Sequence, residues 1–259
     1  MGTPEQQEEL KRLLAPIMLR RTKKEVLTEL PDKIYKKFLV ELTGKQAKIY
    51  KSMERDAIAT LSNGETIAAP VVIAQITRLR QIAVSTQLLS EEVAESAKFE
   101  ALMELIRDNM TEHKMVVFSQ FRKAIELFSK QLDEAGIKWV SVTGAIKQED
   151  RHQATKDFQE KDDIRVMLAT IEAAAHGLTW TAADIAVFLD RHWTPAINQQ
   201  AEDRLHRMGQ KNSVTIVNMI ARGTVEEYIE KLLETKGESF DAIVNGQLTA
   251  EDLRQIFNL

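Results

Sequence analysis

Two arginines spaced three residues apart are the part of this sequence best suited to chemistry. Arg204 and Arg207 lie in the run QQAEDRLHRMGQ, which covers residues 199–210. If this run is helical, both side chains leave the same face. Two guanidinium groups aimed in one direction suit a phosphate, because each offers a fixed fork of donors, and Asp203 could orient one of them. The same residues also fit a surface helix with internal ion pairs, such as Asp203 with Arg207.

The elements that must position these arginines follow a repeating pattern of short apolar runs and amphipathic stretches after His113. Short, almost wholly apolar runs cover residues 115–119, 139–143, 164–169, 185–190 and 214–220. Amphipathic stretches follow them at about 121–135, 148–160, 196–207 and 224–236. Strands that alternate with helices of this length indicate right-handed crossovers and a parallel sheet. Apolar runs of this kind are typical of strands covered on both faces, so the sequence predicts an α/β fold with a parallel sheet flanked by helices.

Most of the first 110 residues have the pattern of helices. Apolar side chains recur at helical spacing over residues 5–23, and further helices are predicted over about 43–61, 71–89 and 96–109. The run over residues 34–42 alternates enough to predict a strand. Near the end of the chain, capping boxes that begin at Thr224 and Thr249 predict the starts of the last helices.

Composition excludes several kinds of site. The chain has 259 residues, a formal net charge of −4 and no cysteine, which excludes disulfides, zinc ribbons and thiol catalysis and fits a reducing cytoplasm. No apolar run approaches the ~20 residues of a membrane span, and the N-terminus lacks the pattern of a signal peptide. Residues 11–55 hold 13 basic and 5 acidic side chains, and residues 91–112 hold 2 basic and 7 acidic ones. This asymmetry suits a surface that meets a polyanion or a solvated helical face.

The arginine run also fits a longer pattern, Q-A-x-D-R-x-x-R-x-G-Q. The matching residues, in order and spacing, are Gln200, Ala201, Asp203, Arg204, Arg207, Gly209 and Gln210. On these residues the chain resembles motif VI of the Snf2 family of DNA translocases, within helicase superfamily 2. Residues 115–121 resemble motif IV of that family, residues 142–159 the motif that follows it, and residues 169–190 motif V.

Two upstream segments resemble the same family. They are MLRRTKKEVLTELPDK at 18–33 and RLRQIAVSTQLL at 78–89. The order of all segments is that of the family's second RecA-like lobe. The resemblance therefore implies a RecA-like parallel sheet over residues 111–223, a helical protrusion over 1–110 and brace helices over 224–259. The last long helix is expected to leave an uncovered apolar face (Val225, Ile229, Leu232 and Leu233), because in the family this segment returns to lobe one.

The chain departs from the family pattern at a few positions. In motif V, Ala174 and Ala175 stand where the family usually has a glycine pair, and Thr179 stands where it has asparagine. Thr194 replaces the asparagine of a W-N-P run. These changes resemble the distant branch of the family that includes annealing helicases.

The resemblance implies a role for each residue of the arginine run. In the family, ATP sits in a cleft between two lobes, and lobe two supplies arginines that reach the γ-phosphate. Arg204 and Arg207 are therefore the expected arginine fingers, and the residues expected to support the nucleotide site are Gln200, Asp203 and Gly177.

ATP and Mg²⁺ are expected to bind mainly to a first lobe that this chain lacks. The sequence has no G-x-x-x-x-G-K-[ST] run, which would cradle phosphates. The acidic string Asp133-Glu134-Ala135 ends a predicted helix, the wrong place for a residue that holds Mg²⁺, and the histidines have no spacing typical of metal ligands. The chain alone is therefore expected to be inactive as an ATPase.

The resemblance also implies a surface for double-stranded DNA at the ends of the strands. Small hydroxyls and free backbone N–H groups suit phosphate oxygens and carry no sequence code. The expected DNA-binding residues are Ser119, Gln120, Thr143, Gly144, Arg151, Thr170 and Trp193. For Trp193, stacking near DNA and covering the sheet edge are both open, and the basic residues Arg20, Arg21, Lys23 and Lys24 are expected to contact DNA or the first lobe.

Three functions remain open on the sequence. The first is half of an ATP-driven duplex DNA translocase, located in the cytoplasm or with DNA in a nucleoid or nucleus, whose partners are DNA and a first lobe and not a membrane. The second is a non-enzymatic DNA-binding or regulatory module that kept the lobe-two fold. The third, an RNA helicase lobe of superfamily 2, is the weakest, because the segments at 18–33 and 200–210 point to Snf2.

Overall fold

The computed structural model describes residues 30–61, 69–175 and 177–234, together with Gln6, Glu9, Arg12 and Leu13. The chain divides into two compact units, residues 1–30 and 31–259, and the sheet with its helices belongs to the second. The strand over Lys33–Val40 joins the same sheet as the later strands, and the domain bounds expected at 110 and 223 stay a prediction. Of the predicted helix over 5–23, the structure describes Gln6, Glu9, Arg12 and Leu13, and all four are helical. The basic residues Arg20, Arg21, Lys23 and Lys24 and the capping box at Thr249 lie outside the described residues.

Six parallel strands of the described residues form one sheet, in the order β1-β6-β5-β2-β4-β3. Their bounds are β1 Lys33–Val40, β2 Met115–Ser119, β3 Trp139–Val142, β4 Val166–Thr170, β5 Ile185–Phe188 and β6 Val214–Ala221. Each predicted strand is present, with bounds within two residues of the prediction. The predicted parallel α/β sheet is therefore confirmed.

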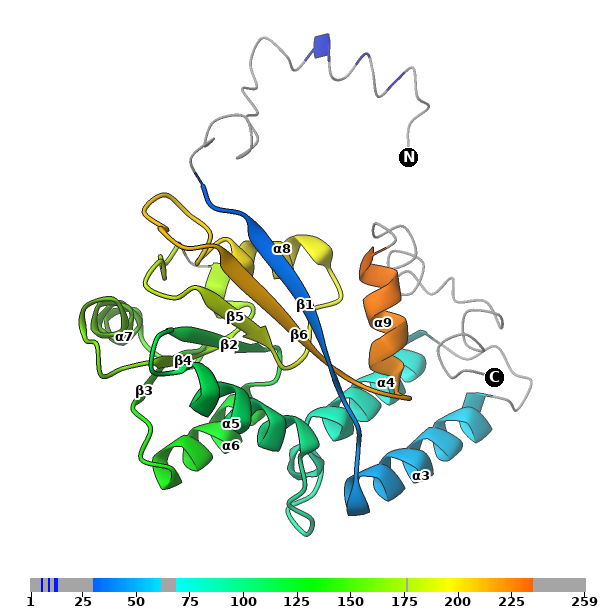
Figure 1. Ribbon diagram of the computed structural model, residues 1–259. Helices are drawn as coiled ribbons and strands as arrows, with labels where there is room; N and C mark the ends of the chain where they lie inside the picture. The colour runs from blue at the N-terminus through cyan, green and yellow to red at the C-terminus, as the bar shows by residue number, and fades with distance from the viewer. Residues whose placement is uncertain are drawn as a thin grey trace. The chain divides into compact units, whose positions relative to one another are not determined.

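Helices cover both faces of the sheet (Figure 1). One face carries α5 (Ala97–Asn109) and α6 (Arg122–Glu134), and the other carries α7 (Gln148–Glu160) and α8 (Pro195–Glu202). Alternation along β2 shows why: Met115 and Val117 pack in the cluster that includes Phe128 of α6. Val116 and Phe118 pack in the opposite cluster with Phe158 of α7. All four of these β2 side chains are fully buried, as the apolar run predicts.

A third apolar cluster joins α3 (Gly44–Leu61), α4 (Ala69–Val84) and α9 (Val225–Glu234). Figure 1 places α9 beside α4. Val225 and Ile229 of α9 are 1% and 5% exposed, and Leu233 packs against the same cluster. The prediction that this helix leaves an uncovered apolar face is therefore wrong for Val225, Ile229 and Leu233, because α3 and α4 supply the covering residues within the chain.

Local caps fix several helix ends. The Ser96 hydroxyl accepts a 3.0 Å hydrogen bond from the N–H of Phe99 and so caps α5. The Thr224 hydroxyl accepts a 3.2 Å hydrogen bond from the N–H of Glu226 at the start of α9. The predicted helix over 71–89 is divided, since α4 ends at Val84 and a short 3₁₀ turn follows at Thr86–Leu88. Of the helices described, none has the length and apolar character to cross a membrane.

Candidate functional site

The two arginines lie beyond the end of a helix and not on its face. Helix α8 ends at Glu202 and Asp203 is its C-cap, so Arg204 and Arg207 belong to the turns over residues 203–209. The prediction of a helix over 196–207 is wrong in this second half. The carbonyl of Arg204 accepts a 2.8 Å hydrogen bond from the N–H of Trp180, a contact with a distant segment that replaces the helical continuation.

Both guanidinium groups nevertheless reach the same loop. Arg204 Nη1 donates to the carbonyl of Leu178 at 3.3 Å, and Arg207 Nη1 donates to the Thr179 hydroxyl at 3.2 Å. Burial lowers the pKa of Arg204 and the positive charge of Arg207 lowers it further, whereas Asp203 opposes the shift. Arg204 is half-buried and Arg207 is exposed. The arrangement is a pair of neighbouring cations, one of which has its guanidinium open to solvent, and it can receive a phosphate oxygen.

The residues predicted to support the nucleotide site, Gln200, Asp203 and Gly177, lie at different distances along the chain from the arginine pair. Gly177 begins the loop that both arginines contact, and its φ of +76° is a conformation that favours glycine. Asp203 adjoins the pair and accepts a 3.0 Å hydrogen bond from Lys33. Gln200 is exposed on α8. Of the three, Gly177 and Asp203 have contacts or backbone conformations that shape the arginine turn.

Sequence reasoning missed the residues that hold the end of α8. The carboxylate of Glu202 is almost fully buried and accepts hydrogen bonds from Lys33 Nζ and Tyr35 Oη, each at 2.9 Å. Arg191 Nη2 lies 3.8 Å from the same carboxylate. The sequence predicted only the strand over 34–42, from its apolar and polar alternation. That alternation does not indicate that Lys33 and Tyr35 bind Glu202, about 170 residues later.

The residues predicted to bind DNA gather at the carboxyl edge of the sheet. Ser119 and Thr170 are paired in register at the ends of β2 and β4. Thr143 follows the pair Val142 and Ala169 at the end of β3. The sheet thus brings three hydroxyl residues into one row, as the predicted parallel sheet requires. All three are buried: Ser119 is 0% exposed, Thr170 is 8% exposed and Thr143 is 6% exposed.

The Ser119 hydroxyl faces inward. It donates to the carboxylate of Asp190 and accepts a 3.0 Å hydrogen bond from the N–H of Phe121. The N–H of Gln120 donates to the same carboxylate at 3.1 Å. Asp190 therefore accepts hydrogen bonds from both the Ser119 hydroxyl and the Gln120 N–H, and the DNA-binding role expected of Ser119 and Gln120 stays a prediction. Asp190, whose role sequence reasoning missed, organises this turn.

Arg151 and Gly144 lie together at the end of the row. Arg151 Nε donates to the carbonyl of Ile146 at 2.8 Å, and its Nη2 donates to the carbonyl of Gly144 at 2.9 Å. Gly144 itself is exposed, and nothing lies within 4 Å of the position a Cβ would take there. The arginine therefore holds the loop after β3 in shape and leaves its backbone accessible.

Trp193 covers a buried cation. The centre of its ring lies 4.7 Å from the guanidinium carbon of Arg80, and Trp193 packs against the apolar cluster of α3, α4 and α9. These contacts describe how Trp193 packs, and its expected role at DNA stays a prediction.

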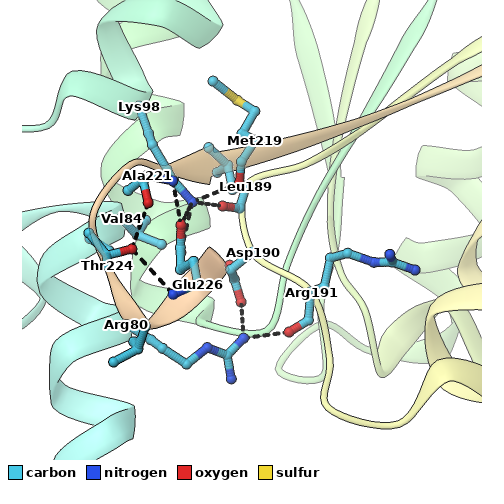
Figure 2. A network of polar contacts seen from close by, with 12 residues as sticks. Arg80, Val84, Lys98, Leu189, Asp190, Arg191, Met219, Ala221, Thr224 and Glu226 are labelled. Carbon is cyan, nitrogen blue, oxygen red and sulfur yellow. Dashed lines mark hydrogen bonds and ion pairs between the residues drawn. The ribbon is translucent and has the colours of Figure 1, made fainter. Parts of the chain in front are cut away.

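A buried ionic network lies behind the carboxyl edge (Figure 2). Figure 2 shows Arg80 next to Asp190 and the carbonyl of Arg191, and Lys98 next to Glu226 and the carbonyls of Leu189 and Met219. Burial lowers the pKa of Arg80 and raises that of Asp190, and the opposite charge of each partner opposes the shift. Among the residues that the structure describes, no group of three or more His, Asp or Glu side chains is placed to hold a metal ion.

Two family models together match most of the chain. The SNF2-related domain matches residues 1–88, and the helicase conserved C-terminal domain matches residues 97–209. Among solved structures, the Sulfolobus solfataricus SWI2/SNF2 ATPase core in complex with double-stranded DNA superposes with a TM-score of 0.76 and 28% identity, over 100% of this chain and 57% of that one. The chain belongs to the Snf2 family of helicase superfamily 2.

Curated relatives of this Snf2 chain include helicases of bacteria and animals. The putative ATP-dependent helicase/translocase YwqA of Bacillus subtilis is 30% identical over 97% of this chain and 29% of its own length. The human DNA annealing helicase and endonuclease ZRANB3 is 31% identical over 92% of this chain and 21% of its own length. The chain thus spans less than a third of these relatives. Its sheet has the RecA-like fold of the SWI2/SNF2 ATPase structures.

Proposed function

We propose that this chain is the second motor lobe of an ATP-dependent duplex DNA translocase of the Snf2 type. The observation that carries the proposal is the convergence of Arg204 and Arg207 on the loop over residues 177–181. Two guanidinium groups held by one turn and one loop form a preorganised cationic site. Such a site can stabilise negative charge that develops on a phosphate bound by a neighbouring lobe.

The proposed chemistry is stabilisation of the transition state for transfer of the γ-phosphoryl group to water. Charge then spreads over the equatorial oxygens, and an arginine finger is worth roughly 10³–10⁵ in rate, or about 4–7 kcal/mol. Arg207 is the better candidate for direct contact because it is exposed. Arg204 adds positive charge behind it and fixes the turn through Leu178.

ATP and Mg²⁺ are assigned mainly to the first lobe. Mg²⁺ would shield the charge of the phosphates there. The arginines of this chain would face that nucleotide from the loop over residues 177–181, so the part assigned to this chain is recognition of the developing charge.

The carboxyl edge of the sheet is the proposed DNA surface. The loop after β3, held by Arg151, offers the accessible backbone of Gly144. Thr143 and Thr170 lie beside it, and the side chain of Gln120 lies at the next strand end. Backbone amides and hydroxyls bind phosphate without reading bases, so we expect little sequence preference and a steep dependence on salt.

ATP hydrolysis by this chain with and without a purified first lobe tests the proposal. We expect no turnover by the chain alone, turnover stimulated by duplex DNA in the mixture, and loss of that turnover with Arg207→Met. Arg107→Met, at an exposed position of α5, is the matched control and should behave as the unchanged chain. A mixture that stays silent while the chain binds duplex DNA would favour the alternative of a non-enzymatic DNA-binding module.

A further inference from the structure

Side chains at the start of β1 bind the end of α8. Their partners are Glu202, the last residue of α8, and Asp203, which directly precedes Arg204. Lys33 Nζ lies 2.9 Å from the carboxylate of Glu202 and 3.0 Å from that of Asp203. The hydroxyl of Tyr35, two residues along the same strand, donates to Glu202 at 2.9 Å. Glu202 and Lys33 have side chains that are 3% and 13% exposed, so this ion pair is shielded from water.

A residue between the two arginines also contacts the segment that leads into β1. His206 Nε2 lies 2.6 Å from the carbonyl of Pro31. Glu202, Asp203 and His206 therefore all bind the segment over residues 31–35. On the other side of the turn, Arg204 and Arg207 bind the loop over 177–181. The turn is held between two segments that are distant in sequence.

The charges of Glu202 and Asp203 explain the role of Lys33 in these contacts. Burial alone would lower the pKa of Lys33, but attraction by Glu202 and Asp203 outweighs it, so the pKa is raised and the side chain stays cationic. The ammonium thus offsets the charge of two adjacent carboxylates. Without it, Arg191 would remain 3.8 Å from Glu202, and Asp203 would be left to act on Arg204, whose pKa already responds to Asp203.

We propose that Lys33 is a positioning residue for the arginine pair. It holds Glu202 and Asp203 toward β1, so that Arg204 and Arg207 stay directed at the loop over 177–181 and available to a phosphate. Lys33 itself touches no nucleotide. The catalytic consequence rests on the proposed function, whereas the positioning of the turn does not.

Three variants and one control separate positioning from simple stabilisation. Lys33→Met removes the charge, Lys33→Arg restores it, and Tyr35→Phe removes one contact to Glu202. Lys37→Met is the matched control, because Lys37 lies on the same strand and pairs with Glu234 at an exposed site, where the two side chains are 48% and 53% exposed.

Amide hydrogen exchange of residues 203–207 in this chain is the first readout. For Lys33→Met we expect exchange there to rise about tenfold more than exchange in the core strands β2 and β4, as expected of local opening. Lys33→Arg should recover most of the protection, Tyr35→Phe should give a smaller rise, and Lys37→Met should give none. Equal changes in the turn and the core strands, or no difference from Lys37→Met, would overturn the proposal.

ATPase kinetics of the chain together with its first lobe are the second readout. Lys33→Met should lower kcat about 10- to 100-fold, the size expected from a small misplacement of a catalytic group, with the KM for ATP changed less than about threefold. An unchanged kcat beside a lost kcat in Arg207→Met would also overturn the proposal. If Arg207→Met has no effect, the proposed function fails, and hydrogen exchange still decides whether Lys33 positions the turn.

Discussion

The guanidinium of Arg80 lies 3.8 Å from the carboxylate of Asp190, and the two side chains are 2% and 0% exposed. Arg80 belongs to α4, whereas Asp190 follows the central strand β5 and accepts hydrogen bonds from Ser119 and Gln120. One ion pair therefore ties the helical region to the row of strand ends that we assign to DNA. Trp193 lies over the guanidinium on one side.

Removal of Arg80 should strongly destabilise the chain. We expect Arg80→Met to lower the free energy of unfolding by about 3–5 kcal/mol, because the change leaves a buried carboxylate without its cation. Urea unfolding measures the difference. The control Lys138→Met breaks an exposed pair with Asp163 and should leave the free energy of unfolding nearly unchanged. Equal losses in the two variants would contradict the role given to Arg80.

A side chain at Gly177 should strain the loop that both arginines contact. Nothing lies within 4 Å of a Cβ built at Gly177, so the cost of Gly177→Ala comes from its φ of +76° alone, which we put at about 1–2 kcal/mol. Gly144→Ala is the matched control, since Gly144 has equal space and no positive φ. Thermal or urea unfolding of both variants is the measurement, and a Gly144→Ala loss as large as that of Gly177→Ala would refute the explanation.

High pH should weaken the contacts of Lys33 and Tyr35 in β1 with Glu202 at the end of α8. Burial and the charge of Glu202 raise the pKa of Tyr35 to about 12, from an ordinary value of 10.0. Between these values the unfolded chain has lost a proton that the folded chain keeps, so the free energy of unfolding falls as pH rises. The raised pKa of Lys33 acts in the same direction.

Tyr35→Phe isolates the tyrosine part of this pH dependence. Urea midpoints compared across that range should fall less steeply for Tyr35→Phe than for the unchanged chain. Titration of tyrosinate absorbance should show one group fewer at about pH 12. Identical slopes in the two proteins would mean that the Tyr35 phenol does not keep its proton through contact with Glu202.

Duplex DNA binding should reveal whether Arg151 meets a phosphate. If it does, Arg151→Met should weaken binding uniformly across DNA sequences and reduce the slope of log K against log salt by about 0.9. If Arg151 serves only the carbonyls of Gly144 and Ile146, binding weakens with an unchanged slope. Arg107→Met on α5 should alter neither quantity.

The sequence was informative where structure follows from local pattern. The run MVVFS predicted β2 with its observed bounds, because a strand covered on both faces must be apolar throughout. The helix predicted over about 96–109 likewise matches α5, which begins after Ser96, where a hydroxyl binds the free N–H groups of the first turn.

Tertiary contacts decided the features that the sequence did not predict. Helix α8 stops at Glu202, where the carbonyl of Arg204 binds Trp180 in place of a helical partner. Ser119 turns inward because Asp190, 71 residues later, accepts its hydroxyl. The parallel partner of β1 is β6, with Lys33 opposite Val214, and no local pattern specifies a pairing across so long a stretch of chain.

The substitution Arg207→Lys in the chain combined with its first lobe tests the central claim most directly. Lysine keeps the charge but not the fork of donors that fits a phosphate. We predict that kcat for DNA-stimulated ATP hydrolysis falls at least about 100-fold while the KM for ATP stays within about threefold, as expected for a contact made in the transition state. An unchanged kcat, or a loss confined to KM, would contradict the assignment of Arg207 as the arginine finger of this lobe.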